Sequence, residues 1–361
     1  MDRIHKNFGF GCMRFPMKGD EVDLEQTSAM VDAFLDAGFN YFDTAHGYLQ
    51  GKSETALKAC LTSRYPRDRY ILTNKLTANF FKTEADIRPL FQAQLDTCGV
   101  DYFDFYLMHA QGAGNYGHFQ ECHAYETAFA LKAEGKVRHV GISFHDQAEV
   151  LEQILTDHPE VEAVQLQFNY LDYEDPAVQS RRCYEVCVKH NKPVIVMEPV
   201  KGGLLANPPA SVREVFEQAK PQLSPAAWAI RFAADQPGVI TVLSGMSNIE
   251  QMRDNIAVMA DFTGLSSEER STLDAARQKL AEIPLIPCTT CNYCAKVCPM
   301  DIGVSGTFTG MNYLTLYGDK DAALHQEGWL VAKHGHKRAN ECIGCGACER
   351  ACPQHIAIRA E

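Results

Sequence analysis

The sequence lacks the long apolar segments that membrane proteins need. No run of 18 or more apolar residues occurs among its 361 residues, and residues 1–15 do not have the charged and then apolar layout of a secretory signal. A transmembrane helix requires about 20 consecutive apolar residues, and export requires the missing layout. We therefore expect a cytoplasmic protein without a membrane partner.

Positive charge and phosphate-binding glycine patterns are also scarce. Lys and Arg number 34 against 46 Asp and Glu, the formal net charge is -12, and no dense basic cluster offsets it. Such a surface repels a phosphate backbone, so we expect no nucleic-acid partner. No G-x-G-x-x-G pattern follows an early strand, which disfavours a doubly wound dinucleotide-binding sheet.

Cysteine, in contrast, is abundant and unevenly placed. Of the 14 cysteines, six are scattered before residue 280 and the other eight lie between residues 288 and 352. Thiols in the cytosol stay reduced, so metal binding explains such a cluster better than disulfides do. The change in density coincides with residues 283–287, where two prolines follow a charged, helical segment at 266–282 and prevent its continuation. We therefore predict two domains, residues 1–283 and 284–361.

In the first domain, short strand-like runs alternate with longer amphipathic segments. Eight runs read as strands: 8–12, 41–44, 70–74, 103–109, 137–143, 163–167, 194–198 and 239–243. Segments between them repeat apolar residues at helical spacing, for example 24–37, 84–97, 120–134, 148–158, 178–190 and 249–260. This alternation is typical of βα units around a parallel sheet. Because eight units match the usual size of a closed (β/α)8 barrel, we predict an α/β TIM barrel.

Polar residues stand at the carboxyl ends of three of these predicted strands, where barrel enzymes build their active sites. They are Asp43 and Tyr48 after the second strand, Lys75 after the third and His109 after the fourth. In this order and spacing the sequence resembles the aldo-keto reductases. Further similar segments are 135–143, 164–169, 198–205 and 245–255.

The resemblance implies a catalytic role for each of the four residues. Reduction of a carbonyl leaves a developing alkoxide that needs a proton donor and electrostatic support. Tyr48 is the expected donor, although a free phenol has a pKa near 10. Lys75, paired with Asp43, is expected to lower that pKa by favouring the phenolate. His109 is expected to donate a hydrogen bond to the carbonyl of a small-molecule substrate.

The resemblance also implies a nicotinamide cofactor, NADP or NAD. The positions expected to contact it are Ser143, Gln165, Met197, Gly245, Ser247, Gln251 and Asn255. Two of the neighbouring positions depart from the family pattern: Phe144 replaces an asparagine, and Met197 replaces an aromatic ring. A flavin is a second possible cofactor because it would account for both changes. A tight turn and a helix cap are the alternative explanation for Gly245, Ser247 and Asn255.

The second domain contains two copies of one cysteine pattern. Each copy is C-x2-C-x2-C-x3-C-P, at 288–299 and at 342–353, which is the run found in bacterial two-cluster ferredoxins. In that arrangement the fourth cysteine of each run ligates the other cluster. We therefore expect a small α+β ferredoxin-like domain with two 4Fe-4S clusters. One is expected on Cys288, Cys291, Cys294 and Cys352, and the other on Cys342, Cys345, Cys348 and Cys298. Zinc, the alternative metal, is disfavoured by the evenly spaced triple with a fourth cysteine.

The segment between the two cysteine runs, residues 301–341, contains several aromatic residues and a predicted helix at 322–331. We expect it to pack against the barrel, because a compact two-cluster unit has too small a core for so many rings.

Three functions are compatible with the sequence. The first is an oxidoreductase that acts on a carbonyl or related unsaturated molecule, with electrons relayed through the clusters and an external carrier of the ferredoxin or flavodoxin type. The second is an NAD(P)H-dependent carbonyl reductase whose clusters are structural or sense redox state. The third is a redox sensor or adaptor without catalysis, which the complete set of Asp43, Tyr48, Lys75 and His109 disfavours.

Overall fold

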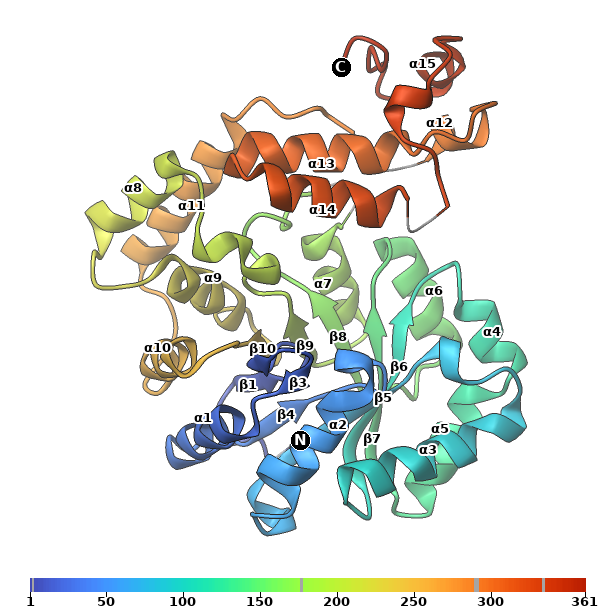
Figure 1. The fold of residues 1–361 in the computed structure, drawn as a ribbon. Helices are drawn as coiled ribbons and strands as arrows, with labels where there is room; N and C mark the ends of the chain where they lie inside the picture. The colour runs from blue at the N-terminus through green and yellow to red at the C-terminus, as the bar shows by residue number, and fades with distance from the viewer. Residues whose placement is uncertain (2, 176–177, 289–291, 333–334) are drawn as a thin grey trace. The chain divides into compact units, whose positions relative to one another are not determined.

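The structure, a computed structural model, describes residues 1, 3–175, 178–288, 292–332 and 335–361. Its first part contains a closed barrel of eight parallel strands (Figure 1). The strands are β1 (Phe8–Gly11), β4 (Tyr41–Asp43), β5 (Ile71–Leu76), β6 (Phe103–Gln111), β7 (Val137–Phe144), β8 (Ala163–Gln167), β9 (Val194–Met197) and β10 (Val239–Gly245). Each pairs with the next in chain order, and β10 closes onto β1. The predicted barrel is confirmed.

Helices connect successive strands and surround the barrel (Figure 1). Those close to the predicted segments are α1 (Leu24–Asp36), α3 (Glu84–Cys98), α5 (Ala124–Ala133), α6 (Ala148–Asp157), α7 (Ser180–Lys189) and α10 (Ile249–Met259). Their ends follow local signals. The helix α3, for example, begins at a capping box between Thr83 and Asp86 and ends at Gly99, whose φ is +67°. Glycine adopts this left-handed conformation without the steric cost that a side chain would add.

The elements that were not predicted include the hairpin of β2 (Met17–Lys18) and β3 (Glu21–Val22), and the helices α2 (Lys52–Leu57), α4 (Tyr116–Glu121) and α9 (Pro225–Ala234). In α9, seven of ten residues are buried. A helix that is apolar around most of its circumference lacks the periodic pattern by which amphipathic helices are recognised.

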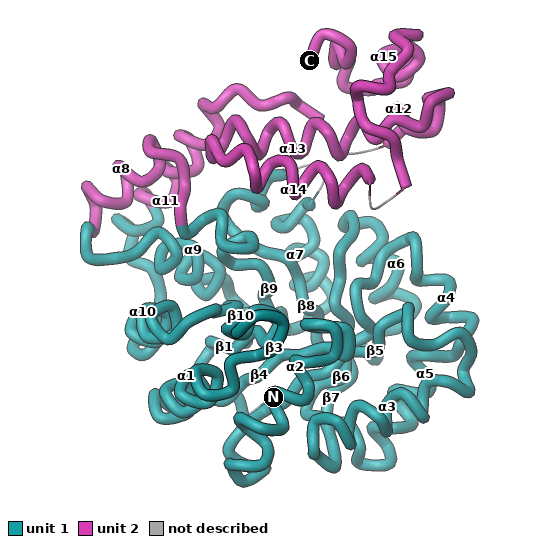
Figure 2. Tube along the Cα trace, in the orientation of Figure 1, with its two compact units in different colours: residues 1–206, 221–270 teal, residues 207–220, 271–361 magenta. Residues whose placement is uncertain are grey.

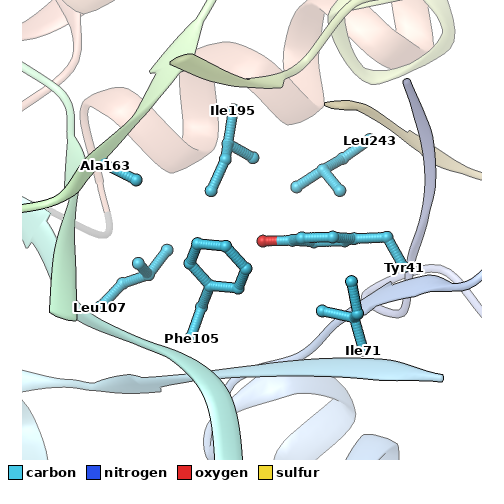
Figure 3. Packing of buried hydrophobic residues seen from close by; sticks show 7 residues of the cluster. All are labelled: Tyr41, Ile71, Phe105, Leu107, Ala163, Ile195 and Leu243. Atoms are coloured by element: carbon cyan, nitrogen blue, oxygen red, sulfur yellow. The ribbon is translucent and has the colours of Figure 1, made fainter. Parts of the chain in front are cut away.

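The interior of the barrel is filled with side chains from its strands. Figure 3 shows the cluster, which consists of Tyr41, Ile71, Phe105, Leu107, Ala163, Ile195 and Leu243. The rings of Tyr41 and Phe105 lie 5.6 Å apart. Burying one such large apolar side chain contributes about 1.5–3 kcal/mol. The barrel is therefore a packed core that holds its strand ends in fixed positions.

The C-terminal part of the chain consists of helices and loops and has a small core of its own. The helices are α11 (Ser267–Ala281), α12 (Tyr293–Lys296), α13 (Val304–Tyr317), α14 (Lys320–Leu330) and α15 (Ala347–Ala351). The core comprises Cys294, Ile302, Val304, Phe308, Cys348 and Ile356. Within its described residues the β part of the expected α+β domain is only one bridge, between Ile302 and Lys337.

The predicted helix at 322–331 corresponds to α14, whereas α13 was not predicted. Glycines at 306 and 310 lower the helical propensity of α13.

Spatial grouping divides the chain into two compact units (Figure 2). The first comprises residues 1–206 and 221–270, and the second comprises 207–220, including α8 (Ala210–Ala219), and 271–361. The division between 270 and 271 falls inside α11. The predicted domain boundary between residues 283 and 284 rests on the change in cysteine density. It stays a prediction. None of the described helices is long and apolar enough to cross a membrane.

Candidate active site and cluster sites

The candidate catalytic residues form the next inward-facing layer beyond the interior cluster. Side chains alternate between the two faces of a strand, so residues two or four positions beyond an interior residue also point inward. The residues placed in this way are Asp43 on β4, Lys75 on β5, His109 on β6, Gln165 on β8, Met197 on β9 and Gly245 on β10. Since the parallel strands end at one edge, this layer lies at the carboxyl end of the barrel, where barrel enzymes carry out their chemistry.

Lys75 connects three of the predicted groups. Its Nζ donates to Oδ1 of Asp43 at 2.5 Å, to the carbonyl of Thr44 at 2.8 Å and to the hydroxyl of Tyr48 at 3.2 Å. An ammonium has three N–H donors, so all of them are used. Lys75 is completely buried and Asp43 is 3% exposed, and such buried charges persist when they are paired. Because the Tyr48 oxygen accepts from Lys75, its own O–H remains able to donate to a ligand.

Burial and neighbouring charges shift the pKa values of Lys75 and Tyr48. Burial opposes the charge on Lys75, but Asp43 and Tyr48 hold its pKa above the usual value, so it remains an ammonium. Burial raises the pKa of Tyr48, and the nearby charge of Lys75 only partly offsets that rise. Lys75 lowers the pKa of Tyr48, as expected, but the net pKa is raised because desolvation of the phenolate is the larger effect.

His109 lies beside Tyr48. Their ring centroids are 5.9 Å apart, and Nδ1 of His109 is 2.6 Å from Oγ1 of Thr77. Burial, together with the charges of Lys75 and His145, holds the pKa of His109 well below its usual value, so the imidazole is neutral at neutral pH. If the Thr77 hydroxyl donates to Nδ1, the proton is on Nε2, which can then donate to a ligand.

Ser143 and Gln165 are neighbours on β7 and β8, where they are register partners. The Gln165 amide donates to Oδ2 of Asp43 at 2.9 Å, which connects it to the Lys75 chain. Ser143 is fully buried, and its Oγ has no hydrogen-bond partner among the described residues. A buried hydroxyl without a partner is uncommon, and at this strand end, beside the Lys75 chain, it is available to a ligand. The pair therefore fits a ligand with an amide or similar polar group.

The other candidate cofactor residues form local contacts in this structure. Gln251 accepts from the backbone N–H of Ser247 at 2.7 Å, and Asn255 donates to Oγ of Ser244 at 2.8 Å. Met197 is half-buried at the end of β9. Phe144 is 2% exposed and contributes, with Leu166 and Cys183, to the lining of a cavity of about 110 Å³. The large ring at position 144 is therefore packed away from solvent.

A buried carboxylate next to the site was not identified from the sequence. Glu54 of α2 is fully buried, and it binds Nδ1 of His46 at 2.8 Å and the side-chain amide of Asn74 at 2.7 Å. Asn74 in turn accepts from the backbone N–H of Lys75 at 2.8 Å. The bond to Glu54 raises the pKa of His46, which the sequence analysis did not assign to the site. A glutamate in a short helical segment carries no sequence signal for such a contact.

Several residues at the carboxyl end of the barrel have a strained backbone. Positive φ values occur at Leu49 and Gln50 after β4, at Ala110 within β6, and at Glu198 and Lys201 after β9. Each non-glycine residue in this region costs on the order of 1–3 kcal/mol, and such residues cluster at functional sites. These loops are therefore held in conformations that the surrounding packing imposes.

In the second unit, two cavities collect the cysteines in the crossed arrangement. One, of about 370 Å³, is lined by Cys298 of the first run together with Cys342, Cys345 and Cys348 of the second. The other, of about 20 Å³, is lined by Cys288 and Cys294 of the first run together with Cys352 of the second. Cys291, the remaining predicted ligand, lies outside the described residues. The first lining contains all four cysteines expected for one cluster, and the second contains three of the four expected for the other.

A site for a single metal ion would need several ligand side chains that converge on one point. Within the described ranges, no three His, Cys, Asp or Glu side chains converge as ligands of one metal ion.

Comparison with known proteins agrees with this architecture. The model described as the aldo/keto reductase family matches residues 7–278, and that of a 4Fe-4S dicluster domain matches residues 287–357. The NADH-specific methylglyoxal reductase of Escherichia coli (strain K12) is 26% identical over 271 residues, which cover 63% of this chain and 82% of the relative. The uncharacterized oxidoreductase YqkF of Bacillus subtilis (strain 168) is 25% identical over 297 residues, covering 74% and 91%.

Solved structures show the same fold. The aldo-keto reductase from Klebsiella pneumoniae in complex with NADPH matches with a TM-score of 0.61 at 24% identity, over 74% of this chain and 89% of that chain. The aldo-keto reductase AKR11C1 from Bacillus halodurans, in its holo form, matches with a TM-score of 0.60 over 75% and 91%. The first family model spans well over half of the residues. The chain is therefore an oxidoreductase of the aldo/keto reductase family that carries a C-terminal 4Fe-4S dicluster domain.

Proposed function

We propose that the barrel interconverts a carbonyl, or a related unsaturated group, and its reduced form in a small molecule, with two 4Fe-4S clusters that exchange electrons with an external carrier. The observation that carries this proposal is the hydrogen-bonded chain from Asp43 through Lys75 to Tyr48, with His109 beside it. These groups supply what carbonyl reduction requires at the oxygen, namely a proton donor and a second hydrogen-bond donor.

Each residue has a defined part in the reduction. The carbonyl oxygen is held by the O–H of Tyr48 and by Nε2–H of neutral His109. As the carbon receives two electrons and a hydrogen, the O–H bond of Tyr48 breaks and its proton passes to the substrate oxygen. Lys75 stabilises the phenolate that remains, and Asp43 keeps Lys75 charged within the buried site. Solvent then returns the proton to Tyr48.

A nicotinamide, when bound, supplies the hydride for this reaction. The buried and unpartnered Oγ of Ser143 supports such a ligand, because the carboxamide of a nicotinamide would satisfy it. The names of similar proteins point to both forms of the cofactor: the Escherichia coli relative is named NADH-specific, and the Klebsiella pneumoniae structure contains NADPH. We therefore propose NADP or NAD as cofactor, with flavin as an alternative that also explains Phe144 and Met197.

The clusters are assigned to the two crossed cysteine sets, on the support of the cavity linings. Each 4Fe-4S cluster accepts or donates one electron at a time, so two clusters together match the two electrons of a carbonyl reduction. Splitting a hydride into single electrons requires a flavin or a radical-stabilising substrate.

A second candidate function avoids this requirement. A carbonyl reductase that uses NAD(P)H alone balances both electrons and protons, and its clusters would be structural or redox-sensing. The Asp43–Lys75–Tyr48 chain within the barrel is sufficient for this simpler reaction without a contribution from the clusters.

Anaerobic purification followed by donor comparison tests the proposal. We expect about eight iron and eight acid-labile sulfide per chain, and carbonyl turnover with a ferredoxin or a viologen as donor. Turnover with NADH or NADPH that is unchanged when the clusters are held oxidised, and absent with one-electron donors, would instead select the second candidate. Zinc without sulfide would exclude the clusters.

A further inference from the structure

We propose that the side-chain hydroxyl of Thr307, in α13, donates a hydrogen bond to a sulfur of the second-run cluster and raises the reduction potential of that cluster. The second-run cluster is the one whose expected ligands are Cys298, Cys342, Cys345 and Cys348. This inference rests on the cluster part of the proposed function. It concerns a residue outside both cysteine runs, to which the sequence analysis gave no role.

One face of α13 lines the cavity that collects these four cysteines. The residues of α13 in the lining of this cavity, about 370 Å³ in volume, are Val304, Thr307, Phe308 and Met311. Positions that differ by three, four and seven residues lie on the same side of an α-helix. Three of these side chains are apolar, so Thr307 places a hydroxyl group in an otherwise apolar row.

The hydroxyl of Thr307 needs a partner that the chain does not provide. Its Oγ1 is buried and has no hydrogen-bond partner among the described residues. The large majority of buried polar side-chain atoms in proteins are paired, and a hydroxyl always has one O–H to donate. The acceptors that the other walls of the same cavity bring together are the cysteine sulfurs. A sulfur of the cluster would therefore satisfy this hydroxyl.

A neighbouring threonine of α13 shows the bond that Thr307 does not make. Oγ1 of Thr309 donates to the carbonyl of Ser305 at 3.0 Å. A threonine within a helix commonly bonds in this way to the carbonyl four residues earlier. For Thr307 that carbonyl belongs to Gly303, which accepts the backbone N–H of Thr307 at 3.0 Å but not its hydroxyl. The hydroxyl of Thr307 is therefore left for the cavity.

Backbone groups already donate to two sulfurs of the same ligand set. The N–H of Ile302 lies 3.4 Å from Sγ of Cys298, and the N–H of Gly344 lies 3.3 Å from Sγ of Cys342. A thiolate that ligates iron is negatively charged, and hydrogen bonds to ionised acceptors are the strong ones. The lining thus supplies donors to the sulfurs, and Thr307 adds one from the side of α13.

Such a donor favours the reduced form of the cluster. Hydrogen bonds to the sulfurs are among the factors that set the reduction potential of an iron–sulfur cluster. When the cluster takes one electron from an external carrier, its negative charge increases, while Thr307 keeps its proton and no bond breaks. The hydroxyl dipole stabilises the more negative state more strongly, so the potential rises. With Thr307 the second-run cluster is therefore the better electron acceptor.

A redox titration of the full anaerobic protein, followed by electron paramagnetic resonance, tests the inference. Thr307→Val keeps the size and the branching of the side chain and removes the O–H. At a fixed applied potential we expect the ratio of reduced to oxidised second-run cluster to fall about tenfold, a shift of about 59 mV to more negative potential for a one-electron couple. The other cluster should keep its potential. The same change made in Cys352→Ser, which removes a ligand of the other cluster, should show the same shift.

Three further variants separate the hydroxyl from the packing of α13. Thr307→Ser retains the O–H and should restore most of the wild-type potential. Thr307→Ala removes the O–H with a smaller side chain and should shift the potential in the same direction as Thr307→Val. Thr309→Val, whose hydroxyl already has a carbonyl partner in the same helix, is the matched control and should change neither potential.

Iron and acid-labile sulfide, measured on every variant, show whether the clusters are assembled. Unchanged potentials in Thr307→Val with full iron content, or an equal shift in Thr309→Val, would overturn the inference and leave the clusters of the proposed function in place. A shift confined to the other cluster would also overturn it. A wild-type protein without iron and sulfide would remove the cluster assignment and this inference together.

Discussion

At the scale of single residues, the candidate site depends on one buried cation. Lys75 is the donor that joins Asp43, Tyr48 and the backbone of Thr44. The backbone of Lys75 is also held, because its N–H donates to the side-chain oxygen of Asn74 and its carbonyl accepts from Gln94 at 3.0 Å. Contacts to both the side chain and the backbone therefore hold the ammonium in place.

Replacing Lys75 should destabilise the protein as well as abolish turnover. Lys75→Met leaves the Asp43 carboxylate buried without its cation, and breaking such a pair costs about 3–5 kcal/mol. Thermal and urea denaturation measure the loss. The double variant Lys75→Met with Asp43→Asn should recover part of the stability but no activity. Equal stability of the single variant and the wild type would contradict the assigned ion pair.

A tyrosine-to-phenylalanine change isolates the proton donor. In Tyr48→Phe the ring still packs, but the proton is missing, so turnover should fall by roughly a hundredfold or more, as expected for loss of a general acid. Tyr65→Phe, whose hydroxyl binds Asp32 on the surface, is the matched control. Steady-state rates of the wild type and of both variants with one carbonyl substrate test this. An undiminished rate of Tyr48→Phe would exclude Tyr48 as the proton donor.

The protonation of His109 predicts a pH profile. Because burial holds its pKa well below 6.5, the imidazole stays neutral as the pH falls through the range where a free histidine becomes charged. The rate of carbonyl reduction should therefore show no acid limb near pH 6.5. Rates measured between pH 5.5 and 8 on wild type and His109→Gln test this. An acid limb near 6.5 that disappears in the variant would show that His109 titrates normally.

At the scale of elements, the helices α13 and α14 approach each other closely because α13 has glycine at the contact positions. A Cβ on Gly306 would lie 2.8 Å from Cγ2 of Val331 and 2.9 Å from Cβ and the carbonyl oxygen of Leu330. A Cβ on Gly310 would lie 2.9 Å from Cβ of Glu327. The glycines that weaken the helical signal of α13 in the sequence are therefore required by its close approach to α14.

Gly306→Ala should accordingly separate this helix pair. The new methyl group meets backbone and Cβ atoms that cannot move aside, and overpacking of this kind costs typically about 1–3 kcal/mol. Gly328→Ala, in α14, has only a flexible arginine end at 3.8 Å and should be neutral or slightly stabilising. Thermal unfolding and iron retention under a chelator compare the two. If both variants behaved alike, close packing at Gly306 would be disproved.

At the scale of the whole molecule, the two cysteine runs are interdependent. Cys298 lies with the cysteines of the second run, and Cys352 lies with those of the first. Residues separated by some fifty positions in the chain are thus expected to complete the same clusters. The C-terminal domain should therefore assemble as one unit.

Removing one crossing ligand tests this interdependence. In Cys298→Ser the cluster of the second run should be lost or weakened while that of the first run remains, so iron should fall from about eight to about four per chain. Cys352→Ser should do the reverse. Cys187→Ala, a buried cysteine of α7, is the control with unchanged iron. Electron paramagnetic resonance of the reduced protein identifies which cluster survives, and loss of the cluster on the variant's own run would refute the crossing.

The sequence by itself determined the elements and the chemistry of the groups. Short β-rich runs determined the eight strands, and apolar residues at helical spacing determined the helices close to the predicted segments, because both patterns are local in the chain. Spacing within each cysteine run indicated iron–sulfur ligation for the same reason. The choice of Asp43, Tyr48, Lys75 and His109 followed from their places at strand ends. All these signals lie within a few residues of one another.

Only the tertiary structure decided the properties that depend on distant neighbours. The net rise in the pKa of Tyr48 reflects burial of the phenol in the folded protein. The burial of the Ser143 hydroxyl without a partner and the contact of the buried Glu54 carboxylate with Asn74 likewise depend on segments far apart in sequence. Closure of the barrel brings these segments together, and a one-dimensional pattern contains no measure of such distances.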